Sequence, residues 1–61
     1  MKADEILTLE EVAEILKSSV KTVRRRIAFG KIRSFKEGGR VRVLNSDLDD
    51  YINGLIEKGR R

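Results

Sequence analysis

The sequence predicts a mainly α (α+β) domain with the element order helix-helix-β-hairpin-helix, on three observations. Apolar residues recur at the spacing of an amphipathic helix in three separate segments. Between the second and third segments, the spacing changes to the two-residue alternation of strands on either side of a glycine pair. The chain has 61 residues, no proline and no internal repeat, so we expect residues 1–61 to form a single domain.

A first helix is predicted at residues 9–16. Thr8 and Glu11 have the spacing of a capping box, in which each side chain accepts a hydrogen bond from the other residue's backbone N–H. An apolar stripe at positions i, i+3, i+4 and i+7 follows, made of Leu9, Val12, Ala13 and Leu16. Glu10 and Glu14 lie on the opposite side, which faces solvent.

A second helix is predicted at residues 20–29, after a break at residues 17–19. Ser19 is suited to cap its start, and Gly30 to end it in the left-handed conformation. Two short helices across a three-residue break predict a helix-turn-helix motif. The apolar residues of this helix, which face inward, are Val20, Val23 and Ile27.

The outward face of this second helix is basic. At roughly 100° per residue, Lys21 and Arg25 lie opposite Val23, whereas Thr22 and Arg24 flank them. Arg26 lies close to the edge of the core.

Residues 35–43 predict a β-hairpin. We expect Phe35 to share the inner face with Val41 and Val43, which requires Phe35 to pair with Val41 and gives a three-residue loop at residues 37–39. The basic residues Lys36, Arg40 and Arg42 then share the solvent face.

A third helix is predicted after Asn45-Ser46-Asp47, which supplies an N-cap and a carboxylate for the helix dipole. Its apolar stripe consists of Leu48, Tyr51, Ile52 and Leu55. Gly59 is expected to end the helix before a basic Arg60-Arg61 tail. The aromatic residues Phe29, Phe35 and Tyr51 are interpreted as core or core-edge side chains, because too few aromatics alternate with the basic positions to form a base-stacking platform.

The net charge of +4 is concentrated in the middle of the chain. Residues 17–42 hold ten basic residues and one acid, a net charge of +9, while residues 1–16 sum to −4 and residues 43–61 to −1. This distribution is typical of a site for a polyanion flanked by scaffold.

Several functional classes are excluded by composition. The chain has no His and no Cys, so we expect no catalytic residues, no metal site, no disulfide and no cofactor. Asp47, Asp49 and Asp50 are close together, but they are better explained as a charged helix start than as a catalytic group. There is no apolar run of the length that a membrane span or a secretory signal needs, so we expect a cytoplasmic protein.

Basic residues on the second helix of a helix-turn-helix predict contact with double-stranded DNA. Lys21 and Thr22, near the helix start, are the best candidates for base edges, and Arg25 could bind guanine or phosphate. Arg24 and Arg26 complete the basic triplet. On the hairpin, Arg40 leads a glycine-rich tip that could approach a minor groove.

The sequence also resembles a known family. The stretches that carry the resemblance are LTLEEVAEIL (7–16), SVKTVRRRI (19–27), GKI (30–32), FKEGGRVRV (35–43) and DL (47–48). Together, in this order and spacing, they resemble the excisionase-type, MerR-like winged helix-turn-helix family, over roughly residues 7–56 and thus nearly the whole chain. Arg26 departs from the family pattern, where an aliphatic residue is usual, as do Arg33 and Val41, where proline and an aromatic residue are common.

The resemblance implies a fold whose second helix enters the major groove and whose hairpin wing reaches the adjacent backbone or minor groove. It places Ser19, Lys21, Thr22 and Arg25 on the helix. On the wing it places Gly39, Arg40 and Arg42. With the basic residues singled out above, the predicted DNA-binding set is Ser19, Lys21, Thr22, Arg24, Arg25, Arg26, Lys36, Gly39, Arg40 and Arg42.

The resemblance further implies a role in DNA recombination. Family members bind and bend DNA beside an integrase or another recombinase, as directionality factors, or act as small regulators of transcription, and many come from phages and mobile elements. We therefore expect a nucleoid-associated, bacterial or phage-encoded protein that is monomeric in solution and lines up cooperatively on repeated sites.

Three alternatives to an excisionase remain open at this point. The first is a small transcription regulator, which would bind at promoters rather than at attachment sites. The second is a protein-interaction module that docks through Glu10 and Glu14 or through the end of the third helix. The third is a DNA-binding fragment of a longer recombinase or terminase.

Overall fold

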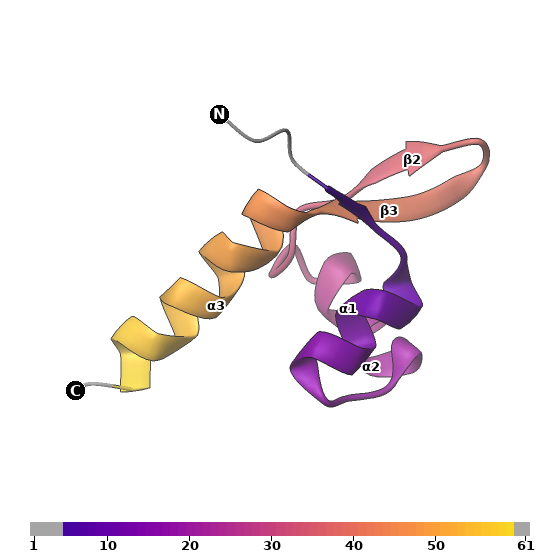
Figure 1. Cartoon of the computed structure of the whole chain (residues 1–61). Coiled ribbons are helices and arrows are strands. Elements are labelled where there is room, and N and C mark those ends of the chain that lie inside the picture. The colour runs from indigo at the N-terminus through magenta and orange to yellow at the C-terminus, as the bar shows by residue number, and fades with distance from the viewer. Residues whose placement is uncertain (1–4, 60–61) are drawn as a thin grey trace.

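The computed structural model describes residues 5–59 and confirms the predicted class and element order. Its elements are β1 (Ile6–Leu7), α1 (Leu9–Leu16), α2 (Val20–Ala28), β2 (Phe35–Glu37), β3 (Arg40–Leu44) and α3 (Asn45–Gly59). Helices α1 and α2 pack together, the hairpin of β2 and β3 extends to one side, and α3 extends to the other (Figure 1). The predicted Arg60-Arg61 tail lies outside the described residues.

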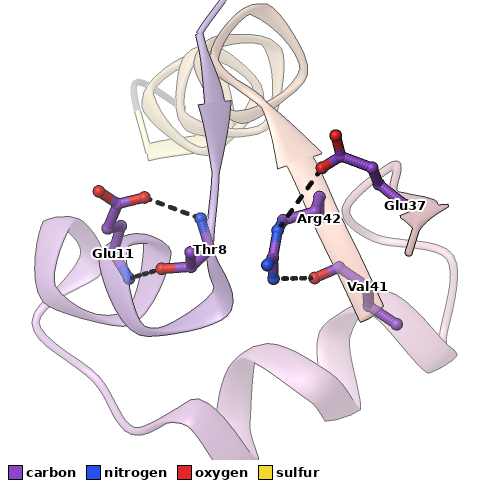
Figure 2. Close-up of polar contacts among 5 residues, drawn as sticks. All are labelled: Thr8, Glu11, Glu37, Val41 and Arg42. Carbon is purple, nitrogen blue, oxygen red and sulfur yellow. Dashed lines mark hydrogen bonds and ion pairs between the residues drawn. The ribbon is translucent and has the colours of Figure 1, made fainter. Parts of the chain in front are cut away.

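Helix α1 begins and ends with local hydrogen bonds. The capping box is confirmed: the Thr8 N–H donates to Glu11 Oε1 at 2.8 Å, and the Glu11 N–H donates to Thr8 Oγ1 at 3.1 Å (Figure 2). At the other end, Lys17 adopts a left-handed conformation with φ of 54°. The Ser18 N–H then reaches the Ala13 carbonyl at 2.9 Å, which closes the helix.

Helix α2 is closed in the same manner. Ser19 caps it as predicted, because its Oγ accepts a hydrogen bond from the Thr22 N–H at 3.1 Å. The helix ends one residue earlier than expected, with Phe29 as its C-cap. Gly30 follows with φ of 76°, and the Lys31 N–H donates to the Arg26 carbonyl at 2.9 Å. The turn between the helices and the exit from α2 are therefore both fixed by backbone bonds.

The hairpin, residues 35–44, is hereafter called the wing, and its predicted register is wrong. Phe35 pairs with Arg42, Lys36 with Val41 and Glu37 with Arg40, which leaves a two-residue turn. Gly38 and Gly39 form this turn with φ of 60° and 78°. Positive φ at both central residues is the type I′ geometry, whose twist matches that of the flanking strands, and only glycine adopts it twice without strain.

The register also changes which side chains share a face. Paired residues lie on the same face of a sheet, so Phe35 lies with Arg42 rather than with Val41 and Val43. Lys36 lies with Val41, on the face opposite Arg40 and Arg42. The predicted shared face of three basic residues is therefore wrong, and Lys36 is separated from the other two.

A short strand at the start of the described chain was not expected from the sequence. Strand β1 pairs antiparallel with β3, so the three-stranded sheet has the order β1-β3-β2. The Asn45 N–H extends this pairing with a hydrogen bond to the Glu5 carbonyl at 2.9 Å. Two apolar residues are too short to display the alternation by which strands are recognised.

The core draws on every helix and on the sheet. Its buried residues are Leu7, Leu9, Val12, Ala13, Val23, Ile32, Val43 and Leu48. Partly buried side chains that pack against it are Leu16, Val20, Ile27, Val41, Tyr51 and Ile52. These sets confirm the inward faces predicted for α1 and α2, while Leu7 and Ile32 are additions that no periodic pattern marked.

Helix α3 departs from the prediction at both ends. It begins at Asn45, directly after β3, so the three residues expected to precede it form its first turn, with Asp47 near the N-terminus as expected. Leu55, predicted in the buried stripe, is 47% exposed because the second half of α3 extends beyond the core. Phe29 is 72% exposed, so its predicted place at the core edge is also wrong. Within residues 5–59, no helix combines the length and the apolar character that crossing a membrane requires.

Candidate nucleic-acid interface

The outward side of α2 presents cations at fixed positions. Val23 is fully buried against the core, which sets the rotation of the helix. Lys21, Arg24 and Arg25 are consequently exposed, as their spacing predicted. The first turn of α2 contains no acid, so no carboxylate offsets the positive end of the helix dipole.

The two hydroxyl groups at the start of α2 are linked to each other. Ser19 Oγ accepts the Thr22 N–H and donates its proton to Thr22 Oγ1 at 3.0 Å. Ser19 is thus occupied by the cap. The Thr22 hydroxyl keeps its own proton for a donor bond outward.

Arg26 occupies a different environment from the other two arginines of the triplet. It is partly buried, in agreement with the predicted position near the core edge. Its Nη1 donates a hydrogen bond to the Tyr51 hydroxyl, and its Cζ lies 5.9 Å from the centre of the Tyr51 ring. The side chain therefore connects α2 to α3, with a cation–π contact in addition to the hydrogen bond.

The wing carries two arginines in different states. Arg40 is exposed beside Gly39 at the tip, whereas the Arg42 side chain is 23% exposed. The Arg42 Nε lies 3.9 Å from Glu37 Oε1 across the hairpin, and its Nη1 donates to the Val41 carbonyl at 3.4 Å (Figure 2). Lys36 is exposed on the other face of the wing.

A hollow of about 270 Å³ lies between α2, the start of α1 and the wing. Its lining consists of Leu9, Glu10, Arg24, Gly39, Arg40, Val41 and Arg42. Three arginines from two elements distant in sequence thus line one open space. Guanidinium groups offer forked N–H donors that match the oxygens of a phosphate, so the hollow is suited to a phosphodiester.

The structure thus joins four of the predicted residues, Arg24 with Gly39, Arg40 and Arg42, around the hollow. Lys21 and Thr22 lie towards the start of α2, outside the lining. Two acids near this surface were missed as functional residues: Glu10, which lines the hollow, and Glu37, which pairs with Arg42. Glu37 carried a sequence signal, because it is the one acid within residues 17–42.

Comparison with known proteins agrees with this geometry. Residues 6–55 match the family described as Helix-turn-helix domain, which covers more than half of the chain. No curated protein and no solved structure matches the sequence. The chain therefore belongs to the helix-turn-helix domain family, and this membership indicates binding to double-stranded DNA.

Proposed function

We propose that this chain is a sequence-selective protein that binds and bends double-stranded DNA, and that it acts as an excisionase-like recombination directionality factor. In this proposal α2 lies in a major groove and the wing lies on the adjacent backbone or minor groove. One observation carries it: Arg24 of α2 and Arg40 and Arg42 of the wing line the same hollow. A phosphate held there fixes the register of both elements on the duplex.

Sequence is read at the start of α2. Lys21 is exposed and Thr22 is partly exposed, and both side chains keep donor protons that suit acceptors on base edges. Arg25 lies one turn later on the same side and binds guanine or phosphate. Ser19 contributes by capping α2, and Arg26 positions the helix through Tyr51.

In this proposal the wing contributes affinity through contacts with the DNA backbone and groove, whereas α2 recognises the base sequence. Gly39 brings the backbone of the tip close to DNA without a side chain in between, and Arg40 reaches the groove beside it. Lys36 faces away from Arg40 and Arg42. It therefore contributes to the positive electrostatic field around the wing rather than to the hollow.

The recombination role rests on the resemblance of residues 7–56 to excisionases. Monomers line up on repeated sites and shape the DNA for an integrase. Adjacent monomers that bind side by side together hold DNA more tightly than one domain does.

The first experiment measures salt dependence on duplex DNA. If five to seven cations neutralise phosphates, log K falls against log salt with a slope of about −4.5 to −6. A gel-shift or anisotropy titration over a range of salt concentrations gives this slope. Undetectable binding, or binding insensitive to salt, would refute the proposal.

The second experiment separates reading from gripping. Lys21→Ala or Thr22→Ala relaxes preference at one or two base pairs, at a cost of about 1–3 kcal/mol for the preferred sequence, whereas Arg40→Ala weakens binding evenly across sequences. Selection of duplexes from a random library by each variant measures this difference. Equal preference in all three variants contradicts the assignment.

The selected sequence also distinguishes the biological roles. Sites that cluster at a recombination attachment site, and that migrate as bent DNA in circular-permutation gels, support the directionality factor. Sites confined to promoters, with unbent DNA, favour a transcription regulator instead.

A further inference from the structure

A second recess lies between α2 and α3 and is distinct from the hollow beside the wing. It measures about 560 Å³, and its apolar floor includes Phe29, Gly54 and Leu55. The exposed second half of α3 forms one wall, where this helix extends away from the α1–α2 pair (Figure 1). We call this recess the α2–α3 groove.

The floor of the groove exposes large apolar side chains. Phe29 is one of two phenylalanines in the chain, yet 72% of it is exposed, and Leu55 is 47% exposed beside it. Ile56, the next residue of α3, is 51% exposed but lies outside the lining of the groove. Adjacent exposed apolar side chains of this size are typical of surfaces that bind another molecule.

Gly54 is the second indication of an outside partner. Glycine is a poor helix former, and Gly54 lies within a 15-residue helix. A Cβ placed on Gly54 would meet nothing within 4 Å, so the packing of this chain does not require glycine there. A glycine that the fold does not need, in the lining of a groove, is suited to close approach by a side chain of something else.

The charges around the groove indicate what that partner carries. Arg25, Lys31 and Lys58 line it, against one acid, Asp50. Arg26, which also lines it, is bound to Tyr51. The apolar floor is unsuited to a nucleic-acid backbone, whereas the basic surroundings attract carboxylates.

We propose that the α2–α3 groove docks an acidic segment of a partner protein, with an apolar side chain of that segment inserted over Gly54 between Phe29 and Leu55. The surrounding carboxylates of the segment pair with Lys31 and Lys58. The groove adjoins the proposed DNA-binding surface, because Thr22 and Arg25 of α2 also line it. Gly54, Leu55 and Lys58 lie outside the proposed DNA-binding set, so substitutions there test the docking site by itself.

The test uses the full chain and a phage-displayed library of random peptides about 12 residues long, enough for three helical turns. Selection on the wild-type chain enriches acidic peptides that contain a large apolar residue. Synthetic copies of the winners then bind Gly54→Leu about tenfold more weakly or worse, because the new side chain fills the floor. The matched control is Asn53→Leu, the same new side chain at an exposed neighbour outside the groove, which binds them as the wild type does.

Lys58→Glu provides a second variant, at the wall rather than the floor, and weakens the acidic peptides without adding bulk. Both Gly54→Leu and Lys58→Glu keep the preferred DNA sequence of the wild type. No enriched peptide, enriched peptides without acidic residues, or winners that bind Gly54→Leu normally would overturn the proposal. So would self-association that Gly54→Leu abolishes, which would assign the groove to a second copy, or loss of sequence preference in Gly54→Leu, which would assign it to DNA.

Discussion

The helix pair at residues 8–30 and the wing at residues 35–44 both contribute arginine to the same hollow, but they are held in different ways. In the helix pair, each helix is closed at both ends by local hydrogen bonds. Each helix also contributes one fully buried valine to the core, Val12 from α1 and Val23 from α2. In the wing, Val43 is the buried residue, and residues 36–40 are all exposed around the turn.

The firmer packing of the helix pair and the greater exposure of the wing suit the two regions to different parts in DNA recognition. The backbone positions of Lys21, Thr22 and Arg25 are set by the core and by the caps before any DNA is present, so α2 itself needs no ordering on binding. The tip of the wing is held by its strand pairing and by the turn, and it has more freedom to adjust. A rigid reader beside an adaptable grip is consistent with the proposed division of roles.

The largest expected effect comes from the same substitution made in both regions. Val23→Ala lowers the free energy of unfolding by about 2 kcal/mol, because it removes two buried methyl groups and leaves a cavity. Val41→Ala, at a partly buried site in the wing, lowers it by about 1 kcal/mol or less. Urea unfolding followed by circular dichroism measures both values. Equal losses would mean that the wing is packed as firmly as the helix pair.

An intermediate effect is expected at the tip of the wing. Gly38→Val costs about 1–2 kcal/mol, because a β-branched residue is strained at φ of 60°. Gly38→Asn, the matched control, costs much less, since asparagine tolerates this conformation and is favoured in type I′ turns. Thermal unfolding and amide exchange of the Glu37 and Arg40 N–H groups, the hydrogen-bonded pair that closes the turn, measure the difference. Equal stability of the two variants would contradict the two-residue turn.

The smallest effect concerns the ion pair of the wing. Glu37→Gln tightens DNA binding by about two- to tenfold at low salt, because it frees Arg42 and removes a charge that repels phosphate. Glu14→Gln makes the same charge change on the exposed outer side of α1 and serves as the control. A fluorescence anisotropy titration compares the two variants. If both tighten binding equally, net charge alone accounts for the gain and the pair at Glu37 has no special part.

The helix pair was predicted more accurately from the sequence than the wing was. The reason is that the helix ends depend on interactions between residues close together in the sequence. The signals for the helix ends are local: they are the capping box at Thr8, the cap at Ser19 and the glycine stop at Gly30. Each involves residues three or four positions apart, so both interacting residues can be identified from a short stretch of sequence. Their hydrogen bonds in the structure are the ones that the residue types require.

The predicted register of the wing was wrong because two features of the sequence favoured different loop lengths. Alternation of Phe35 with Val41 and Val43 favoured an odd loop, whereas the Gly38-Gly39 pair favoured a two-residue turn. The turn geometry prevailed, and Phe35 took its place beside Arg42, where it is only partly buried. A single aromatic residue in a three-residue strand is a weaker constraint than the twist of a type I′ turn.

Other features depended on contacts between residues far apart in the sequence, which a short stretch of sequence does not reveal. Strand β1 exists because β3 lies beside it, and the exposure of Phe29 and Leu55 depends on how far α3 extends past the core. For the candidate site, the sequence predicted the basic residues of α2 that the structure exposes. The hollow shared by Arg24, Arg40 and Arg42 required the tertiary fold.

The direct passage from β3 into α3 has a consequence for how this chain tolerates changes of length. Leu44 ends the strand and Asn45 begins the helix, so there is no connecting residue to absorb an insertion. One residue added to the first turn of α3 rotates everything before it by about 100° relative to everything after it. Leu48 and Val43 can then no longer face the same core, whereas a residue added between Gly38 and Gly39 alters only the tip. Natural variation in length should therefore accumulate at the turn and be absent from the junction.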